Sequence, residues 1–164
     1  SLSPIQGSTV AGWLPVELAG TGLAIDTPPG WRDAPRAGLL ANRIEPRGRA
    51  LLSAALLPGD DLAEVAERDR ETWLAIAPER REGAGFVYAV GGRPALRTTW
   101  TSLRSTGAEV FIAVGDEGVL RVALLAEPDA FAELEPVLVG GAASVRQRAQ
   151  GATDNVQGPG SGTP

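Results

Sequence analysis

Residues 82–126 read EGAGFVYAVGGRPALRTTWTSLRSTGAEVFIAVGDEGVLRVALLA and carry the clearest structural pattern in the chain. Four β-like segments are recognisable in this stretch, at 82–90, 93–103, 108–114 and 118–126. They are separated by Gly91-Gly92, Ser105-Thr106-Gly107 and Gly115-Asp116-Glu117, which are tight-turn compositions. Strands joined by such short turns pair with their sequence neighbours. The stretch therefore predicts a four-stranded antiparallel meander.

The segment 93–103 also indicates which side chains share a face, because successive residues of a strand point to opposite sides. One predicted face holds Leu96, Thr98, Trp100 and Ser102, and the other holds Ala95, Arg97, Thr99, Thr101 and Leu103.

A helix is predicted immediately before the meander. Asp60 or Asp61 is a natural N-cap, and Glu64 stands where a capping-box partner would lie. Apolar residues at helical spacing follow, and the helix should end before Pro78. These residues form the stripe expected to face the core: Leu62, Val65, Ala66, Trp73 and Ile76.

A second helix is predicted after the meander, from about residue 128 to residue 146. Glu127 is the expected N-cap, and Pro128 suits the first helical position. Pro136 interrupts the apolar stripe, so the pattern predicts either a kink or two short helices.

The chain is predicted to form one domain over residues 13–148. Two short β-like runs, 13–19 and 22–26, are followed by the turn 27–31 and by a hairpin with strands at 39–44 and 50–56. Residues 1–12 are expected to be a flexible leader, and the Gly/Pro-rich residues 149–164 a disordered tail. The fold class is α+β, with an antiparallel β-sheet of about six strands flanked by two main helices.

The composition excludes several kinds of chemistry. Among the 164 residues there is no Cys, His or Lys, which removes thiolate nucleophiles, the Ser-His-Asp triad, Schiff-base lysines and the usual zinc ligands. No EF-hand or dinucleotide-binding spacing is present either, so no metal and no cofactor is expected. A hydrolase using two carboxylates remains conceivable, but no pair stands out. The net charge of −5 and sparse basic residues disfavour nucleic-acid binding, and every apolar run is too short to span a bilayer.

Three short motifs together resemble the PsbP-like α/β/α sandwich superfamily. They are Ile25–Trp31 (IDTPPGW), Gly92-Arg93-Pro94-Ala95 at a strand start, and Ala143-Ser144-Val145-Arg146 at the end of the last helix. The resemblance spans about residues 14–147. The superfamily includes photosystem extrinsic proteins, DcrB-like and LpqN-like bacterial envelope lipoproteins, a nuclear-transport factor and effector-binding chaperones of type VI secretion. It implies a shared fold that mostly lacks catalysis, so the fold alone does not select a function.

The candidate partner-binding residues are Trp31, Arg32, Arg36, Arg43 and Arg47. Trp and Arg are enriched at binding hot spots, so the Trp31-Arg32 turn and the Arg-rich hairpin could form a contact patch. The structural alternative is that Trp31 plugs one end of the sheet and that the arginines keep an edge hairpin soluble.

These observations favour a non-enzymatic binding or accessory protein of the bacterial cell envelope that acts through protein–protein contacts. A membrane-embedded complex is one candidate partner, with this chain as its extrinsic subunit. The absence of Met means that Ser1 is not a native translation start, so we expect either a removed signal segment or an artificial start. The expected location is periplasmic or otherwise extracytoplasmic. The alternative is a cytoplasmic chaperone or adaptor of a secretion system, which would need an exposed apolar groove for its effector.

Overall fold

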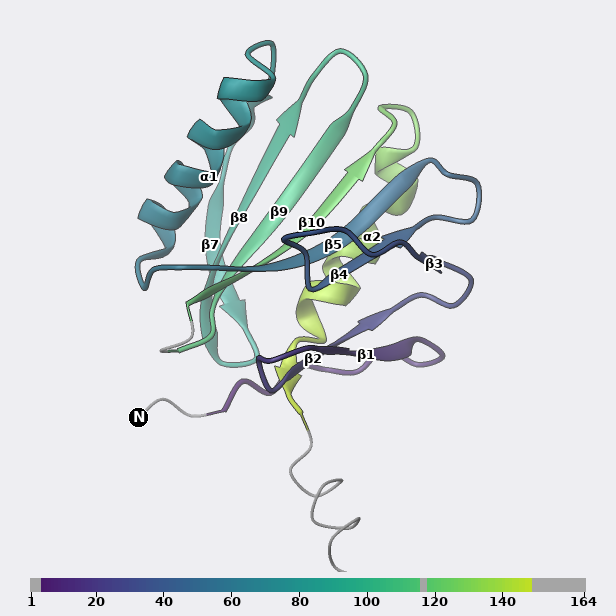
Figure 1. Cartoon of the computed structure of the whole chain (residues 1–164), viewed down its shortest axis with the longest axis vertical. Coiled ribbons are helices and arrows are strands. Elements are labelled where there is room, and N and C mark those ends of the chain that lie inside the picture. The colour runs from purple at the N-terminus through teal and green to yellow at the C-terminus, as the bar shows by residue number, and fades with distance from the viewer. Residues whose placement is uncertain (1–3, 116–117, 149–164) are drawn as a thin grey trace, which may run out of the picture.

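The computed structural model describes residues 4–115 and 118–148, which form two antiparallel sheets and two helices (Figure 1). The small sheet has the order β1 (Leu14–Leu18), β2 (Leu23–Thr27) and β11 (Arg146–Gln147). The eight-stranded sheet runs β3 (Arg32–Asp33), β4 (Ala41–Ile44), β5 (Ala50–Leu57), β10 (Val119–Ala126), β9 (Thr106–Ala113), β8 (Arg93–Thr101) and β6 (Arg81–Glu82), with β7 (Phe86–Val90) also paired to β8. The helices are α1 (Leu62–Ile76) and α2 (Phe131–Ala143).

The predicted fold class is confirmed, although the sheets hold more strands than the six expected. The first meander segment is split into β6 and β7, which both pair with β8. The two-residue strands β3 and β11 are too short to show any periodic signal. The turn between β7 and β8 has two glycines with positive φ, 55° at Gly91 and 82° at Gly92, as tight hairpins of this kind require.

The two faces of the large sheet differ in what covers them. Helix α2 packs on one face over β10, β9 and β5 and also contacts β2, whereas α1 lies on the other face mainly over β8 and β9 (Figure 1). The main core lies under α2 and includes Leu52, Val110, Ile112, Leu120, Val122, Leu124 and Leu138. A small second cluster of Val65, Phe111 and Val119 lies under α1. The alternation predicted for residues 93–103 is confirmed, since Ala95 belongs to the α2 side and Leu96 to the α1 side.

Helix α2 differs from its predicted form at two points. Its N-cap is Ala130 and not Glu127, because residues 127–130 form a turn in which the Ala130 amide donates to the Glu127 carbonyl. Pro136 lies inside one continuous helix, so the prediction of two short helices is wrong. A proline at this position removes one helical hydrogen bond, which the buried packing of Leu134 and Leu138 on the sheet outweighs.

Helix α1 begins as predicted but packs differently. Asp61 is the N-cap and accepts a hydrogen bond from the Glu64 amide at 3.0 Å. The expectation that Trp73 and Ile76 lie in the core is wrong, since they are 40% and 70% exposed. The second half of the helix lies beside buried charged side chains such as Asp69, and Trp73 lies at the edge of a groove, where its ring stays partly exposed.

The two ends of the described chain meet beside β2. The Ser144 hydroxyl accepts from the Asp26 amide at 2.8 Å, and Arg146 pairs with the Asp26 carboxylate at 2.9 Å. The superfamily-like motifs that end in Arg146 and begin near Asp26 therefore hold α2 against the small sheet. Part of the segment expected to be a flexible leader joins this assembly, because Ile5 is an apolar side chain that is only 1% exposed and the Val10 amide donates to Asp26 at 2.9 Å.

Two further expectations concern the chain as a whole. Residues 149–164, which the sequence analysis assigned to a disordered tail, lie outside the described residues. In the part of the chain that the structure describes, neither helix has the length and apolar content needed to cross a membrane.

Candidate binding groove

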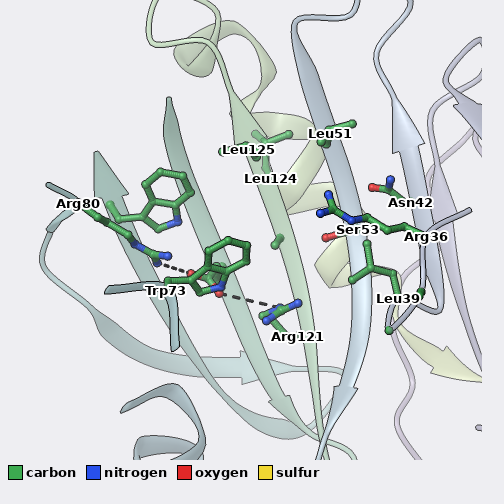
Figure 2. Close-up of a pocket in the computed structure, with 15 residues that line it drawn as sticks. Arg36, Leu39, Asn42, Leu51, Ser53, Trp73, Arg80, Arg121, Leu124 and Leu125 are labelled. Atoms are coloured by element: carbon green, nitrogen blue, oxygen red, sulfur yellow. Dashed lines mark hydrogen bonds and ion pairs between the residues drawn. The ribbon is translucent and has the colours of Figure 1, made fainter. Parts of the chain in front are cut away.

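A groove lies on the α1 side of the large sheet, between α1 and the segment 36–39, and encloses about 350 Å³ (Figure 2). Its floor consists of side chains from β5 and β10 that point away from α2. Leu51 pairs across the strands with Leu125, and Ser53 pairs with Ala123. The groove exists because α1 packs mainly over β8 and β9 and meets β10 and β5 at Val119 and Leu57, away from the residues of the groove floor.

The walls of the groove are mainly apolar. Trp73 of α1 lines one side, and Leu39 lines the other (Figure 2). Trp100 of β8 also lines the groove. Trp100 stands directly opposite Gly107 on β9, and its ring occupies the space above that glycine. A Cβ atom on residue 107 would come within 2.4 Å of the indole ring, so Gly107 is what allows Trp100 to lie against the sheet.

A buried charge network forms the inner end of the groove. The Arg80 guanidinium donates to Glu109 at 2.7 Å and lies over the Trp100 ring, 4.3 Å from its centroid. Arg121 donates to Asp69 at 2.5 Å, and its Nε atom lies 4.0 Å from Glu109. Buried charges of this kind persist only when they are paired, because each loses its hydration. The network therefore ties α1, through Asp69, to β9 and β10.

The carboxyl of Glu109 is the titratable group most affected by this environment. Burial, together with the neighbouring Asp69 carboxyl, raises the pKa of Glu109 to about 8, and the opposing attraction of Arg80 is smaller. Its Oε2 atom has no hydrogen-bond partner among the described residues. Burial therefore favours the neutral form of the Glu109 carboxyl.

These features are those of a binding groove. The groove combines an apolar floor with aromatic walls and a few polar groups, as ligand and peptide sites do. The described residues contain no group of three or more acidic side chains that could hold a metal ion, and no His or Cys occurs in the sequence.

The five residues predicted to bind a partner do not form one site. Only Arg36 lines the groove. Trp31 is half-buried and packs against the main core, as the structural alternative anticipated. Arg32 is exposed on β3, Arg47 is exposed in the β4–β5 turn, and Arg43 lies on the opposite face of β4 from the groove-lining Asn42.

Sequence reasoning missed Trp100 and Arg121 as groove residues and assigned Trp73 to the core. Strand alternation correctly predicted which residues share a face with Trp100. Whether that face is covered by a helix or lines a groove depends on where α1 packs. Arg121 could have been recognised from the sequence, because it is the one charged residue in the otherwise apolar run 119–126. A charge inside such a run is expected to have a buried partner.

Comparison with known proteins supports the fold through structure alone. No protein family matches the sequence, and no curated protein resembles it significantly. The cyanobacterial PsbP (CyanoP) of Synechocystis sp. PCC 6803 is similar, with a TM-score of 0.64 and 13% identity over 88% of this chain and 97% of that protein. The Ran-binding protein Mog1p of Saccharomyces cerevisiae has a TM-score of 0.59 and 12% identity over 86% and 97% of the two chains.

A third similar structure is LpqN of Mycobacterium tuberculosis, described as involved in cell envelope biogenesis. Its TM-score is 0.57 at 19% identity, and the match covers 85% of this chain and 96% of LpqN. Identities this low establish the architecture and not the function. The chain has the PsbP-like α/β/α sandwich fold.

Proposed function

We propose that this chain is a non-enzymatic binding or accessory protein of the bacterial cell envelope, and that it binds a partner protein in the groove between α1 and residues 36–39. The observation that carries the proposal is Trp73, a large aromatic side chain that is 40% exposed over an apolar floor. An exposed Trp next to Arg is typical of the few residues that dominate binding energy at interfaces.

The comparisons support this proposal at the level of binding. Mog1p is described as a Ran-binding protein, and LpqN as involved in cell envelope biogenesis. We propose an envelope location for this chain from its likeness to LpqN. The form of partner binding that we favour is that of an extrinsic subunit bound to a membrane-embedded complex.

The exposed apolar groove also suits the alternative function, a cytoplasmic chaperone or adaptor that holds a hydrophobic effector segment of a secretion system. The two functions differ in where the protein works. Sequencing the gene upstream of Ser1 separates them, since an encoded signal peptide excludes the cytoplasmic chaperone.

The arginine patch from the sequence analysis remains a separate proposal. Trp31, Arg32, Arg43 and Arg47 do not line the groove, so any contact that they make would be a second surface. Arg36 is the member that both surfaces would share.

Site-specific photocrosslinking in the native host tests the proposed groove. A photoreactive phenylalanine in place of Trp73 should give one discrete protein adduct. The same residue in place of Val139 is the matched control, because Val139 is also about half exposed but lies on α2, on the other side of the sheet. Equal adducts from both positions, or none from position 73, would refute the groove as the partner site.

A further inference from the structure

We infer that the groove selects a partner segment in which a bulky apolar side chain is followed by an acidic residue, and that Arg36 receives the carboxylate. This inference rests on the proposed function, because it names the chemistry of the partner at the same site. It adds a charge requirement that an apolar groove alone would not impose.

The first support is the position of Arg36. This side chain extends from the segment after β3 back over the floor of the groove toward Ser53 (Figure 2). It is exposed, and it has no acidic partner among the described residues. In this respect Arg36 differs from Arg70 and Arg148, which pair with Glu67 and Glu17. An unpaired guanidinium directed over an apolar floor is a receptor for an anion.

The second support is the charge balance of the groove lining. Arg36, Arg80 and Arg121 line the groove, whereas Glu109 is the one acidic side chain among its lining residues. Arg80 pairs with Glu82 and Glu109, and Arg121 pairs with Asp69, so these buried charges compensate one another. Arg36 is the exposed charge in the lining, and this exposed cation favours an acidic ligand over a basic one.

The third support is the apolar part of the same lining. Leu51, Ala123 and Leu125 form a floor below Trp73 and Trp100, and about 350 Å³ is available above it. A phenylalanine or leucine side chain would be desolvated there, while the next residue of the segment could reach Arg36 at the rim. An apolar anchor beside a charged contact is the usual arrangement of a peptide-binding hot spot.

Capped heptapeptides with a central Phe-Glu, Phe-Gln, Phe-Lys or Ala-Glu pair test this inference. Binding is followed by NMR through the indole N–H signals of the four tryptophans, each assigned by its Trp→Phe variant. Phe-Glu should shift the signals of Trp73 and Trp100 and leave those of Trp13 and Trp31 in place. It should bind about fivefold more tightly than Phe-Gln, as expected for one partly exposed ion pair, and Phe-Lys and Ala-Glu should bind more weakly than both.

Arg36→Gln should remove the preference for Phe-Glu over Phe-Gln. The matched control is Arg32→Gln, because Arg32 is also exposed but does not line the groove. Arg121 is left intact, since its replacement would strand the buried Asp69 carboxylate. Retention of the preference in Arg36→Gln would contradict the assigned role of Arg36.

Three other results would overturn the inference in different ways. Equal binding of Phe-Glu and Phe-Gln would remove the acidic requirement. Shifts confined to Trp13 and Trp31 would place the site elsewhere. Free 4-phenylbutyrate binding as tightly as the peptide would make the groove a receptor for small acids. A discrete adduct from position 73 in the crosslinking experiment would leave the proposed function standing if the acidic requirement alone fails.

Discussion

Glu109 shows how one buried side chain couples the stability of this domain to pH. Burial and the adjacent Asp69 carboxyl raise the pKa of Glu109 to about 8 in the folded protein, from 4.5 as the ordinary value. The folded state therefore binds a proton that the unfolded chain releases. The resulting stabilisation is fully present below about pH 4.5 and is lost as the pH rises through about 8.

Replacing Glu109 by Gln should reduce this pH dependence, because the amide is neutral at every pH and still bonds to Arg80. The unfolding free energy of Glu109→Gln, relative to the unsubstituted protein, should increase between pH 4.5 and about 8. Urea unfolding at several pH values measures the difference. Glu79→Gln, at an exposed position, is the control, and parallel pH profiles for the unsubstituted protein and Glu109→Gln would contradict the assignment.

At the scale of elements, α1 and α2 are held on the sheet by different interactions. Helix α2 buries Leu134, Leu138 and Ala142 on the main core. Helix α1 buries Val65 and Asp69, and it presents Trp73 to the groove. The second half of α1 is therefore held by charge pairs over the sheet more than by apolar packing.

This difference predicts unequal effects of truncating one large side chain on each helix. Leu138→Ala should cost about 2–5 kcal/mol of unfolding free energy, because Leu138 is 0% exposed and its removal leaves a cavity. Trp73→Ala should cost about 1 kcal/mol or less, because an exposed site leaves no closed cavity and Ala is the better helix former. Urea unfolding measures both. A loss of several kcal/mol of unfolding free energy in Trp73→Ala would show that Trp73 packs as a core residue.

At the scale of the whole molecule, the beginning and the end of the described chain hold each other in place. The Gln147 amide donates to the Ile5 carbonyl at 3.0 Å, and the Ser8 amide donates to the Ala143 carbonyl at 2.8 Å. These contacts join residues far apart in sequence to β2 and to the end of α2. These contacts therefore hold the domain together in addition to the pairing within its hairpins.

Ile5→Ala should therefore destabilise the whole domain, although residue 5 is near the terminus. Truncating a fully buried isoleucine costs about 2–5 kcal/mol. Leu14→Ala is the matched control, because Leu14 is 57% exposed on β1 and should cost less than about 1 kcal/mol. Thermal unfolding of both variants checks the prediction, and equal melting temperatures would show that residues 5–12 add nothing to the stability of the domain.

The elements that depend on local chemistry could be predicted from the sequence. The meander follows from glycine turns such as Gly91-Gly92 and from two-residue alternation, and the start of α1 follows from Asp61. The superfamily resemblance added their order. These features are readable because turn geometry, strand alternation and helix capping act between residues only a few positions apart.

Only the tertiary structure decided where α1 lies on the sheet, and the candidate site depends on that placement. Asp69, Arg80, Glu109 and Arg121 are spread over the chain and meet only after α1 packs on β8 and β9. The helical stripe of α1 showed that Trp73 shares a face with Val65, but not that this part of the helix would lie at the edge of a groove. Of the five residues predicted to bind a partner, Arg36 alone reaches the groove. Periodicity tells which face of an element is apolar, whereas the surface that this face meets is set by contacts between distant parts of the chain.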